Sequence, residues 1–345
     1  MDHPSRVGKY EIEKFLGGGM SHVYQARDSV LGRRVALKIL TEAGMKDEES
    51  KSRFLMEARM ASNIAHENII SVYDFGEDQG RPFIVMEFLE GESLRSAIRH
   101  HRLGDYHRRL RIALQVARAL DYAHSKKIIH RDIKPENIHL DAQGRAKLMD
   151  FGIAKSEGVH LTRAGFTLGT PFYMAPEQVL GQPLTPQADV YSFGLLLFEL
   201  LTGKKAVEGD KVQEIFETVL YKPVNLDPLD DAKVSERMRR LIDRCTAKQP
   251  AQRPPGLGPV ADEIERMMDP TRLPSSVRDA PGPLVEYHTP TLTLNLPNPL
   301  RGSMGFIGKF SGLLKTQTGL MLLAAAAVIF AVMLIYAILK AAHVV

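Results

Sequence analysis

Three short polar motifs follow one another in the second and third quarters of the chain, and their order and spacing restrict its fold more than any other feature. The first, His130–Asn137, reads HRDIKPEN. The second, Asp150–Gly152 (DFG), begins thirteen residues after the first ends. The third, Ala175–Glu177 (APE), follows a segment rich in glycine and threonine. Three motifs in this order and at these spacings are very unlikely to occur together by chance.

The composition is that of an ordinary globular protein. Of the 345 residues, 44% are hydrophobic and 25% are charged, which excludes a disordered, collagen-like or coiled-coil chain. The 45 basic and 41 acidic residues give a net charge of +4, too small to indicate nucleic-acid binding. The single cysteine, Cys245, excludes an intrachain disulfide and a multi-cysteine zinc site and favours a reducing compartment. The N-terminus has no apolar stretch, so we expect no signal peptide.

An uncharged stretch near the C-terminus predicts a membrane-spanning helix. Residues Gly319–Leu339 include no charge, proline or side-chain amide, and as a helix they would be about 31 Å long, close to a hydrocarbon core of about 30 Å. We therefore expect one transmembrane helix at 318–340, after a proline-rich linker at 269–317. Basic residues precede this segment at Arg301, Lys309 and Lys315, against Lys340 after it. This bias favours a single-pass protein of the cell membrane with a cytoplasmic N-terminal part. A helix that packs on the soluble domain or lies at the membrane surface is the alternative.

Residues 10–268 form one predicted globular unit in two styles. The part at about 10–89 predicts a helix at about 51–64 among short strands, which lie at Tyr10–Phe15, His22–Ala26, Arg34–Leu40, Ile70–Phe75 and Phe83–Phe88. The part at about 90–268 is mainly helical. Apolar residues at 3/4 spacing from Leu110 to Leu120 predict one buried helix face. Asp189–Thr202 is apolar almost all round, which predicts a helix inside the domain that ends before Gly203.

Two features of the strand-rich part indicate a phosphate site. Three adjacent glycines, Gly17–Gly19, stand between two predicted strands, where backbone N–H groups can approach a phosphate closely. Neither a P-loop nor a dinucleotide fingerprint fits, because no Lys-Ser/Thr follows and the next element is a strand. Lys38 and Glu57 could pair across a strand and the helix and hold an ammonium group against phosphate oxygens. A plain hairpin turn and two solvated surface charges are the alternatives.

With the three motifs, the sequence resembles the bacterial-type (Hanks-type) serine/threonine protein kinases over 10–268, about three quarters of the chain. The resemblance implies an α+β fold of two lobes, a small β-rich N-lobe (about 10–89) and a larger helical C-lobe (about 90–268), with ATP in the cleft between them. It implies an enzyme that phosphorylates serine and threonine hydroxyls of proteins, with Mg²⁺, or alternatively Mn²⁺, as the metal ion.

The resemblance also assigns catalytic and metal-binding roles. Asp132 is expected to accept and orient the substrate hydroxyl, and Lys134 to steady the γ-phosphate. Asn137 and Asp150 are expected to bind the metal ions, because hard cations prefer oxygen ligands. All four side chains belong to the first two motifs, so a working kinase needs these motifs to meet in space.

The ATP pocket is expected between the strand-rich lobe and the hinge. Lys38, paired with Glu57, is expected to hold the α- and β-phosphates. Met86 falls at the gatekeeper position, and the backbone after it would bind adenine. The expected ATP contacts are Leu16, Gly17, Gly18, Gly19, Val23, Ala36, Lys38, Met86, Glu87, Leu89 and His139.

Three residues are expected to be structural. Glu177 and Arg253 resemble the buried ion pair that ties the segment between the second and third motifs to the large lobe. Asp189 is expected to hold the backbone of His130–Arg131 from the start of the buried helix. These expectations rest on the resemblance alone.

The segment between the second and third motifs is expected to be an activation loop. Arg131, next to Asp132, needs an anion to compensate its charge. Thr162 and Thr167 are the expected phosphosites, because a phosphate on either could order the segment through Arg131. The phosphate could come from autophosphorylation between two copies of the chain, which could form a homodimer.

The function expected is that of a membrane-anchored serine/threonine protein kinase that acts on proteins, contacts the bilayer through 318–340 and binds no nucleic acid. The alternative is a membrane-anchored pseudokinase, a scaffold that binds nucleotide without transfer. It is favoured by His139, where the family has an apolar residue, and by glycine at only one of the three family loop positions, Leu16, Gly18 and Ser21. A small-molecule kinase is a third reading, which the peptide-docking-like 169–171 segment opposes.

Overall fold

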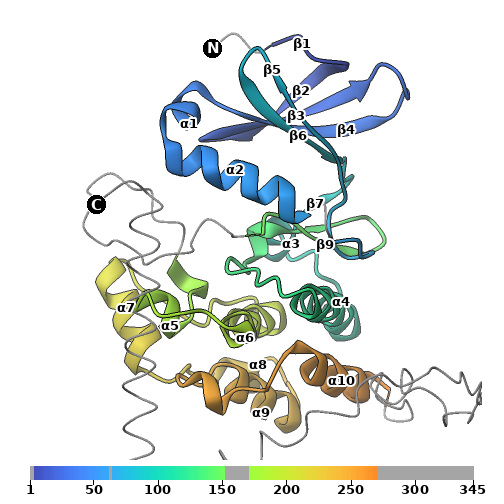
Figure 1. Cartoon of the computed structure of the whole chain (residues 1–345). Coiled ribbons are helices and arrows are strands. Elements are labelled where there is room, and N and C mark those ends of the chain that lie inside the picture. The colour runs from blue at the N-terminus through green and yellow to red at the C-terminus, as the bar shows by residue number, and fades with distance from the viewer. Residues whose placement is uncertain (1–3, 62–63, 152–170, 270–345) are drawn as a thin grey trace, which may run out of the picture. The chain divides into compact units, whose positions relative to one another are not determined.

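The computed structural model describes residues 4–61, 64–151 and 171–269. The N-terminal part is a six-stranded antiparallel sheet in the order β1-β2-β3-β4-β6-β5 (Figure 1). Its strands are β1 (Arg6–Val7), β2 (Tyr10–Gly18), β3 (Ser21–Asp28), β4 (Arg34–Leu40), β5 (Val72–Asp78) and β6 (Arg81–Glu87). Two helices, α1 (Glu42–Lys46) and α2 (Glu48–Ala61), interrupt the strands between β4 and β5.

The register of the central strands sets one lysine in the middle of this sheet. Lys38 of β4 pairs with Val23 of β3 and with Ile84 of β6. Side chains alternate across a strand, so Leu37 and Ile39 point into one core of the sheet and Lys38 points to the opposite face. That face looks toward the rest of the domain, where the second part of the chain packs.

Helix α2 covers part of the same face of the sheet. Its Phe54 and Ala58 pack with Leu40 of β4 and Ile84 of β6 in a small separate core. Asp47 accepts the backbone N–H of Ser50 at 3.2 Å, which caps the helix and sets its start at residue 48. The predicted helix at 51–64 is therefore confirmed in type but begins three residues earlier, and its described part runs to Ala61.

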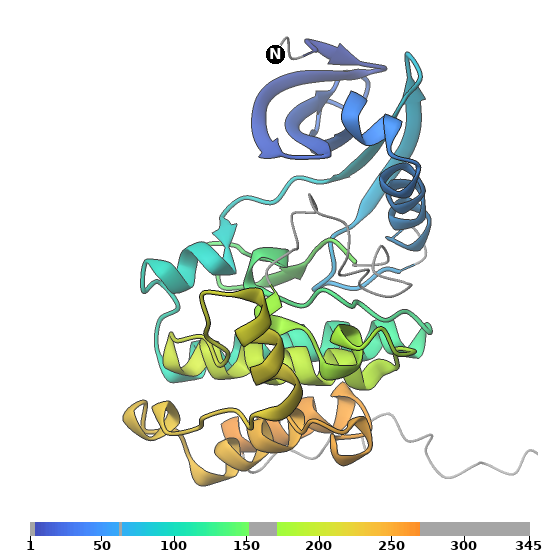
Figure 2. The same cartoon turned by 90° about the vertical axis from the view of Figure 1, so that its left-hand side faces the viewer.

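The second part of the chain is helical, as Figure 2 shows beneath the sheet. A small antiparallel sheet lies at its top, with β7 (Glu92–Ser93), β8 (Ile138–Leu140) and β9 (Ala146–Leu148). The α-helices are α3 (Leu94–Arg99), α4 (Tyr106–Ser125), α5 (Pro176–Val179), α6 (Pro186–Thr202), α7 (Val212–Tyr221), α8 (Pro228–Asp231), α9 (Glu236–Cys245) and α10 (Leu257–Met268). In the described part of the chain, the 3₁₀ helices are η1 (Pro135–Asn137), η3 (Pro171–Tyr173) and η4 (Pro250–Gln252).

Helix α6 is the centre of the helical lobe, because every residue from Ala188 to Leu201 is buried. It packs between α4 and α9, and the contact with α9 is so close that a Cβ at Gly194 would lie 2.7 Å from Cys245 Cβ. The helix ends at Gly203, whose φ of +73° is the left-handed conformation that glycine adopts without strain. The prediction of a helix buried on all sides is therefore confirmed.

The α+β fold of a β-rich lobe and a helical lobe agrees with the prediction, and the five predicted strands are present. The fourth begins at Val72 rather than at Ile70, because the backbone of Ile70 bonds to the Leu148 carbonyl at 3.0 Å instead of to a sheet neighbour. On α4 the predicted apolar face is buried except at Leu114, which is only partly covered.

The predicted membrane segment follows the part of the chain that the structure describes. Across residues 4–61, 64–151 and 171–269, the helices are all too short or too polar to cross a bilayer. The predicted linker at 269–317, apart from its first residue, and the predicted helix at 318–340 lie outside the described residues.

Candidate active site

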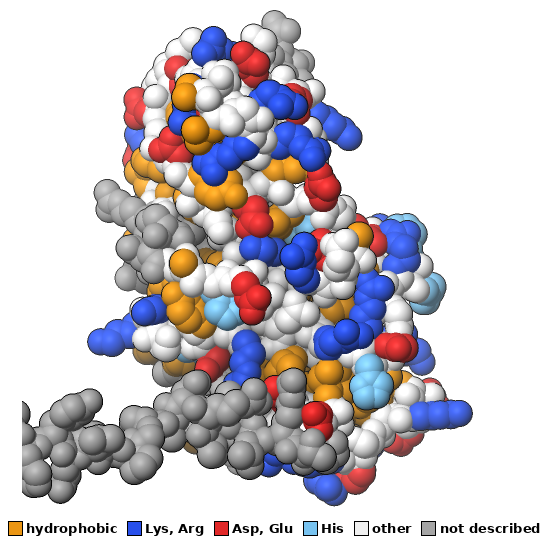
Figure 3. All heavy atoms as spheres, turned by 90° about the vertical axis from the view of Figure 1, so that its right-hand side faces the viewer, with side chains coloured by type: hydrophobic (Ala, Val, Ile, Leu, Met, Phe, Trp, Pro, Cys, Tyr) orange, Lys and Arg blue, Asp and Glu red, His pale blue; other side chains and the backbone are white. Residues whose placement is uncertain are grey.

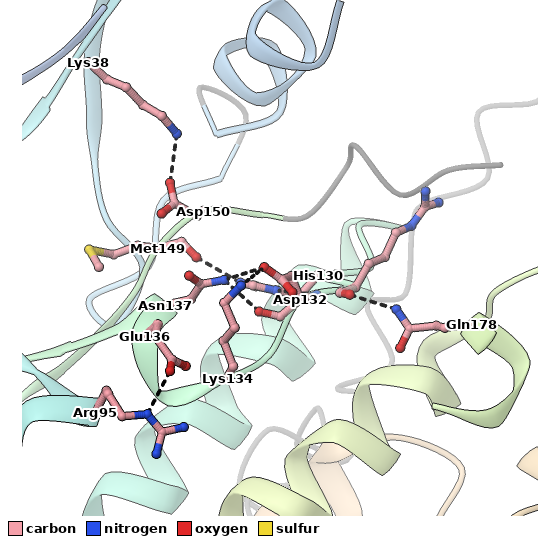
Figure 4. A network of polar contacts seen from close by, with 11 residues as sticks. Lys38, Arg95, His130, Asp132, Lys134, Glu136, Asn137, Met149, Asp150 and Gln178 are labelled. Carbon is pink, nitrogen blue, oxygen red and sulfur yellow. Dashed lines mark hydrogen bonds and ion pairs between the residues drawn. The ribbon is translucent and has the colours of Figure 1, made fainter. Parts of the chain in front are cut away.

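The first motif forms the loop between α4 and β8, and its polar side chains converge on Asp132 (Figure 4). Lys134 Nζ lies 2.6 Å from Asp132 Oδ2. Asn137 Nδ2 donates to the same carboxylate oxygen at 3.0 Å and to the Asp132 backbone carbonyl at 2.8 Å. The carboxylate is thus oriented by two donors and compensated by one positive charge, while 21% of the side chain stays exposed to a substrate.

His130 is fully buried and connects the first two motifs. Its Nδ1 accepts the backbone N–H of Asp132 at 3.3 Å, so Nε2 carries the ring proton and donates to the Met149 carbonyl at 3.0 Å. Burial lowers the pKa of His130, which favours the neutral ring that these two bonds require. The Phe151 ring lies with its centroid 4.6 Å from that of the imidazole. One neutral side chain therefore holds the Asp132 loop beside the Asp150 segment.

Asp189, in the first turn of α6, holds the backbone of the same loop. The residue is 1% exposed; its Oδ2 accepts the His130 N–H at 2.8 Å and its Oδ1 accepts the Arg131 N–H at 2.9 Å. Arg131 has a φ of +67°, a conformation that costs free energy for a residue with a side chain, and these bonds hold it there. The structure thus places Asp189 where the sequence analysis expected it.

Two supports of this loop were not found from the sequence. His124 Nε2 lies 2.7 Å from Asp189 Oδ2, and Gln178 Nε2 donates to the Arg131 carbonyl at 2.8 Å. Neither belongs to a charged pair at recognisable spacing: His124 lies just before the loop, but its partner Asp189 is 65 residues away, and Gln178 is 47 residues from Arg131. No signal in the sequence alone marks them.

The structure also brings Lys38 to Asp150. Lys38 Nζ donates to Asp150 Oδ1 at 3.0 Å, and the two side chains are 13% and 50% exposed. The pairing links the middle of the sheet to the second motif, 112 residues away. The side chain of Glu57 lies outside the described part of the structure, so the Lys38–Glu57 pair stays a prediction.

Lys38 and Asp150 lie in the wall of a cavity of about 220 Å³ between the lobes. Eight expected ATP contacts line it, namely Leu16, Val23, Ala36, Lys38, Met86, Glu87, Leu89 and His139. Asp150 lines it as well. The sequence analysis missed the other lining residues, Ala58, Ile69, Ile70, Val72, Ile84, Phe88, Met149 and Phe151. An apolar residue gives the same sequence signal whether it faces a core or a cavity, so spacing alone does not single these residues out.

The three glycines do not line this cavity but make the β2–β3 hairpin turn beside Leu16. Gly18 has a φ of +142°, and a Cβ there would lie 2.0 Å from the Ser21 carbonyl oxygen, so only glycine fits. The Gly19 N–H donates to that same carbonyl at 3.0 Å. The hairpin-turn alternative therefore describes this loop, and its role toward phosphate stays a prediction.

His139 differs from its apolar neighbours in the cavity wall. Its Nε2 is buried and has no hydrogen-bond partner in the described residues. Burial lowers the pKa of His139, which favours the neutral ring. A neutral imidazole adds no charge to the apolar wall, so the cavity keeps the character that a planar aromatic base requires.

The third motif is tied to the helical lobe by an ion pair. Arg253 donates to Glu177 Oε1 at 2.6 Å and to Oε2 at 2.9 Å, with both side chains buried. Arg253 also donates to the backbone carbonyl of Gln187 at 2.8 Å. A bidentate buried pair of this kind costs several kcal/mol to break from one side, so it fixes where residues 171–177 sit.

A second network beside the Asp132 loop was not found from the sequence. Arg95 of α3 donates to Glu136 at 2.8 Å, to Glu199 at 2.5 Å and to the Tyr173 hydroxyl at 2.5 Å. Tyr173 in turn donates to Glu199. Four elements that are far apart in the sequence meet at this arginine, which explains why no local pattern reveals it.

The expected phosphosites Thr162 and Thr167 lie outside the described residues, as does Gly152 of the second motif. Arg131, which was expected to bind their phosphate, is described, but its partner segment is not. The activation-loop expectation therefore stays a prediction.

The donor set beside Asp132 suits a divalent cation shared with a phosphate. The described residues hold no cluster of three or more His, Cys, Asp or Glu side chains that would make a complete metal cage. Mg²⁺ is commonly bound by one or two protein oxygens together with substrate phosphate oxygens and water. Asp150 offers a half-exposed carboxylate, and Asn137, whose Nδ2 is used by Asp132, offers Oδ1. These two residues therefore fit Mg²⁺ in the presence of a nucleotide.

Comparison with known proteins identifies the family that this chain resembles. The model of the protein kinase domain family matches residues 10–264. Serine/threonine-protein kinase pkn3 of Myxococcus xanthus is 40% identical over 261 residues, which cover 71% of this chain and 47% of pkn3. Serine/threonine-protein kinase PknA of Mycobacterium tuberculosis is 35% identical over 301 residues, covering 84% and 69% of the two chains. Serine/threonine-protein kinase PrkC of Bacillus subtilis is 37% identical over 270 residues, covering 77% and 41%. The chain spans about half the length, or less, of pkn3 and PrkC.

Replacing Asp189 by asparagine tests how the loop is held. Asparagine keeps one acceptor oxygen, so one of the two backbone N–H groups of His130 and Arg131 loses its partner in a buried place. We expect unfolding free energy to fall by about 1–3 kcal/mol, together with a loss of catalytic turnover. Urea unfolding and steady-state kinetics measure the two effects.

The matched control is Asp262→Asn on α10, which weakens the bond from Arg118 at 2.7 Å but leaves the loop alone. It should lower stability without a matching loss of turnover. Full turnover by folded Asp189→Asn would show that this carboxylate supports the fold only.

Proposed function

This chain belongs to the protein kinase family, and we propose that it is a serine/threonine protein kinase, which transfers the γ-phosphoryl group of ATP to serine and threonine hydroxyls of proteins. One observation carries the proposal. A half-exposed Asp150 bound to Lys38 lines a largely apolar cavity between two lobes, and Asp132, bound to Lys134 and Asn137, lies on the loop that His130 holds beside the Asp150 segment. The relatives named serine/threonine-protein kinases support the choice of acceptor.

The proposed reaction uses the charges of this site for alignment rather than for covalent chemistry. The acceptor hydroxyl oxygen attacks the γ-phosphorus, and the bond from that phosphorus to the β–γ bridging oxygen breaks, releasing ADP. Asp132, oriented by Lys134 and Asn137, positions the hydroxyl and accepts its proton. The Lys134 ammonium group lies beside that carboxylate, where it offsets negative charge that develops on the transferred group.

The second group of residues would position the nucleotide. Lys38 would bind the phosphates from the sheet, and Asp150 and Asn137 would hold Mg²⁺. When bound, the cation supplies charge neutralisation to the phosphate oxygens. His139 and its apolar neighbours would enclose the base. Mn²⁺ has the same preference for oxygen ligands and is expected to substitute.

The pseudokinase alternative is less well supported. It rests on the altered glycine loop and on His139, yet Leu16 and Val23 beside that loop both line the cavity, and burial favours a neutral His139. The charged groups that transfer needs are all present, and the described ones are connected. A scaffold that only binds nucleotide would not need Asp132 to be oriented.

Two substitutions test the catalytic assignment. Lys38→Met removes the cation expected on the phosphates, and Asp150→Asn weakens the metal ligand. We expect each to lower phosphoryl transfer by at least about 100-fold, as is typical when a preorganised electrostatic group is lost. Radiolabelled ATP with a protein acceptor measures transfer, and circular dichroism checks that the fold survives.

The control pair makes the same chemical changes at exposed positions of the helical lobe, Lys222→Met and Asp231→Asn. Both should keep transfer within about twofold of the unmodified chain, as surface changes usually do. Near-normal transfer by folded Asp150→Asn would remove the assignment.

Activation is proposed to depend on phosphorylation of Thr162 and Thr167 by a second copy of the chain. The support is Arg131, which is held beside Asp132 in a left-handed conformation and carries a positive charge next to the active site. A phosphate of about −1.5 to −2 charge could bind it and order the segment. The proposal includes a homodimer in which one copy phosphorylates the other.

We expect a Thr162→Ala, Thr167→Ala double variant to lose most activity after preincubation with ATP. Mass spectrometry of the active unmodified chain should find phosphate on at least one of the two threonines. Thr289→Ala, Thr291→Ala in the proline-rich linker is the control. Full activity of the first double variant, or active protein with both threonines unmodified, would contradict the proposal.

Membrane attachment through 318–340 is likewise proposed, with the support of the uncharged Gly319–Leu339 stretch and the basic residues before it. The kinase domain would then lie in the cytoplasm, where ATP is available. The linker at 269–317, about 50 residues, would behave as a coil that spans on the order of 40 Å.

The full chain should resist extraction by alkaline carbonate and should require detergent, because a spanning helix is held by its apolar surface. A chain truncated after Asp269 is the control and should be extracted while remaining active. Release of the full chain by carbonate would contradict the proposal, as would labelling of a tag after Val345 from the cytoplasmic side alone.

A further inference from the structure

One short stretch of the folded domain carries a marked excess of positive charge. Residues 92–111 hold six arginines and three histidines but only two acidic residues. The other 39 basic and 39 acidic residues of the chain balance, so this stretch carries the whole net charge of +4. Like charges this close together repel one another, and an oppositely charged surface would relieve that repulsion.

The stretch forms the junction of α3 and α4 on the surface of the helical lobe. Figure 3 shows basic and histidine side chains gathered at one edge of this lobe. Two of the six arginines bind other residues of the domain. Arg95 binds Glu136, Glu199 and Tyr173. Arg109 donates to the Leu201 carbonyl at 3.0 Å. Arg102 pairs with Glu92 but remains 53% exposed.

The remaining three arginines have no side-chain partner in the described part of the chain. Arg99 and Arg111 are exposed, and Arg108, packed between Gly104 and Gly144, has a buried Nε without a hydrogen bond. His101 and His107 are exposed beside them. We call these five residues the arginine face.

The chain leaves the described domain close to this face. Helices α4 and α10 are antiparallel. A Cβ at Gly258, near the start of α10, would lie 2.9 Å from Asp121. Further along α10, Asp262 and Glu265 bind the earlier residue Arg118 at 2.7 Å and 3.0 Å. Later residues of α10 therefore lie beside earlier residues of α4. The last residue that the structure describes, Asp269, comes at the end of α4 that carries the arginine face, and the linker to the apolar segment begins there.

We propose that the arginine face is a docking surface for an anionic lipid bilayer, on which the tethered kinase domain lies in a fixed orientation. The proposal rests on the membrane anchor proposed above. Each arginine near an anionic surface contributes roughly a fivefold preference for the docked state, so the three unpaired arginines together contribute on the order of 100-fold.

The chain between this face and the anchor has the same charge preference. From Tyr287 to Val345 there is no acidic residue, and the basic ones before the apolar segment are Arg301, Lys309 and Lys315. Both ends of the linker would thus favour the same anionic surface. An acidic protein partner would explain the face alone but not this second basic region.

The test uses the full chain in vesicles of phosphatidylcholine, with or without about 30% phosphatidylglycerol. A fluorophore is placed on the face by His107→Cys, and on α7 by Tyr221→Cys, a residue that is 75% exposed, as the control position. Cys245 is buried, and burial raises the pKa of its thiol to about 12, so it should not be labelled. Lipids that carry a quencher report contact with the bilayer.

We expect the label at residue 107, but not the label at 221, to be quenched in anionic vesicles only. Raising the salt from about 0.1 M to about 1 M shortens the screening length from ~10 Å to ~3 Å and should release the domain. Neutralising Arg99, Arg108 and Arg111 to glutamine should lower the ratio of docked to free domain on the order of 100-fold. The same charge change at Lys204, Lys211 and Lys222 should have little effect.

Carbonate extraction of the same vesicles reports the anchor separately. A chain that is inserted but shows no quenching at residue 107 would overturn the docking proposal and leave the anchor intact. Equal quenching in neutral and anionic vesicles, or unchanged quenching in the triple arginine variant, would also overturn it. Quenching in anionic vesicles without insertion would support the docking face while contradicting the anchor. Phosphorylation of a soluble peptide should be unchanged in the triple variant, because these arginines lie outside the active site.

Discussion

One buried carboxylate, that of Asp189, supports the arrangement on which the proposed chemistry depends. It accepts the backbone N–H groups of His130 and Arg131 from the first turn of a helix that is buried on nearly every side. Because that helix forms the core of the large lobe, the hydrogen bonds from Asp189 hold the loop in one position. The bonds to Asp189 offset the cost of the left-handed backbone at Arg131. Asp132 follows directly, so its position depends on the same bonds.

Charge compensation links this frame to the rest of the site. Lys134 offsets Asp132, Lys38 offsets Asp150, and both pairs keep part of the carboxylate accessible. The buried pair of Glu177 and Arg253 has the opposite character, since no substrate needs to reach it. Partly exposed pairs can exchange partners with a nucleotide or a metal ion, whereas a buried bidentate pair holds the backbone in one place.

Much of the fold was predictable because its signals are local. The alternation of β4 and the all-round apolar α6 identify a central strand and a buried helix, and both appear with nearly the predicted bounds. Errors arose where tertiary contact overrode the local signal. Ile70 looks like a strand residue but bonds to Leu148, and Asp47 starts α2 earlier than its apolar period suggests.

The groups available for chemistry can be identified from the sequence: its motifs contain Asp132, Asn137 and Asp150, a predicted strand carries Lys38, and the resemblance supplies their expected roles. The sequence also determined the excess of arginine at 92–111 and the uncharged stretch near the C-terminus. Which side chains support these groups follows from the three-dimensional fold, as with His124 on Asp189 or Arg95 among its three partners. The reason is physical: such contacts join elements far apart in the chain, and their energy depends on distance and burial, which no local spacing encodes.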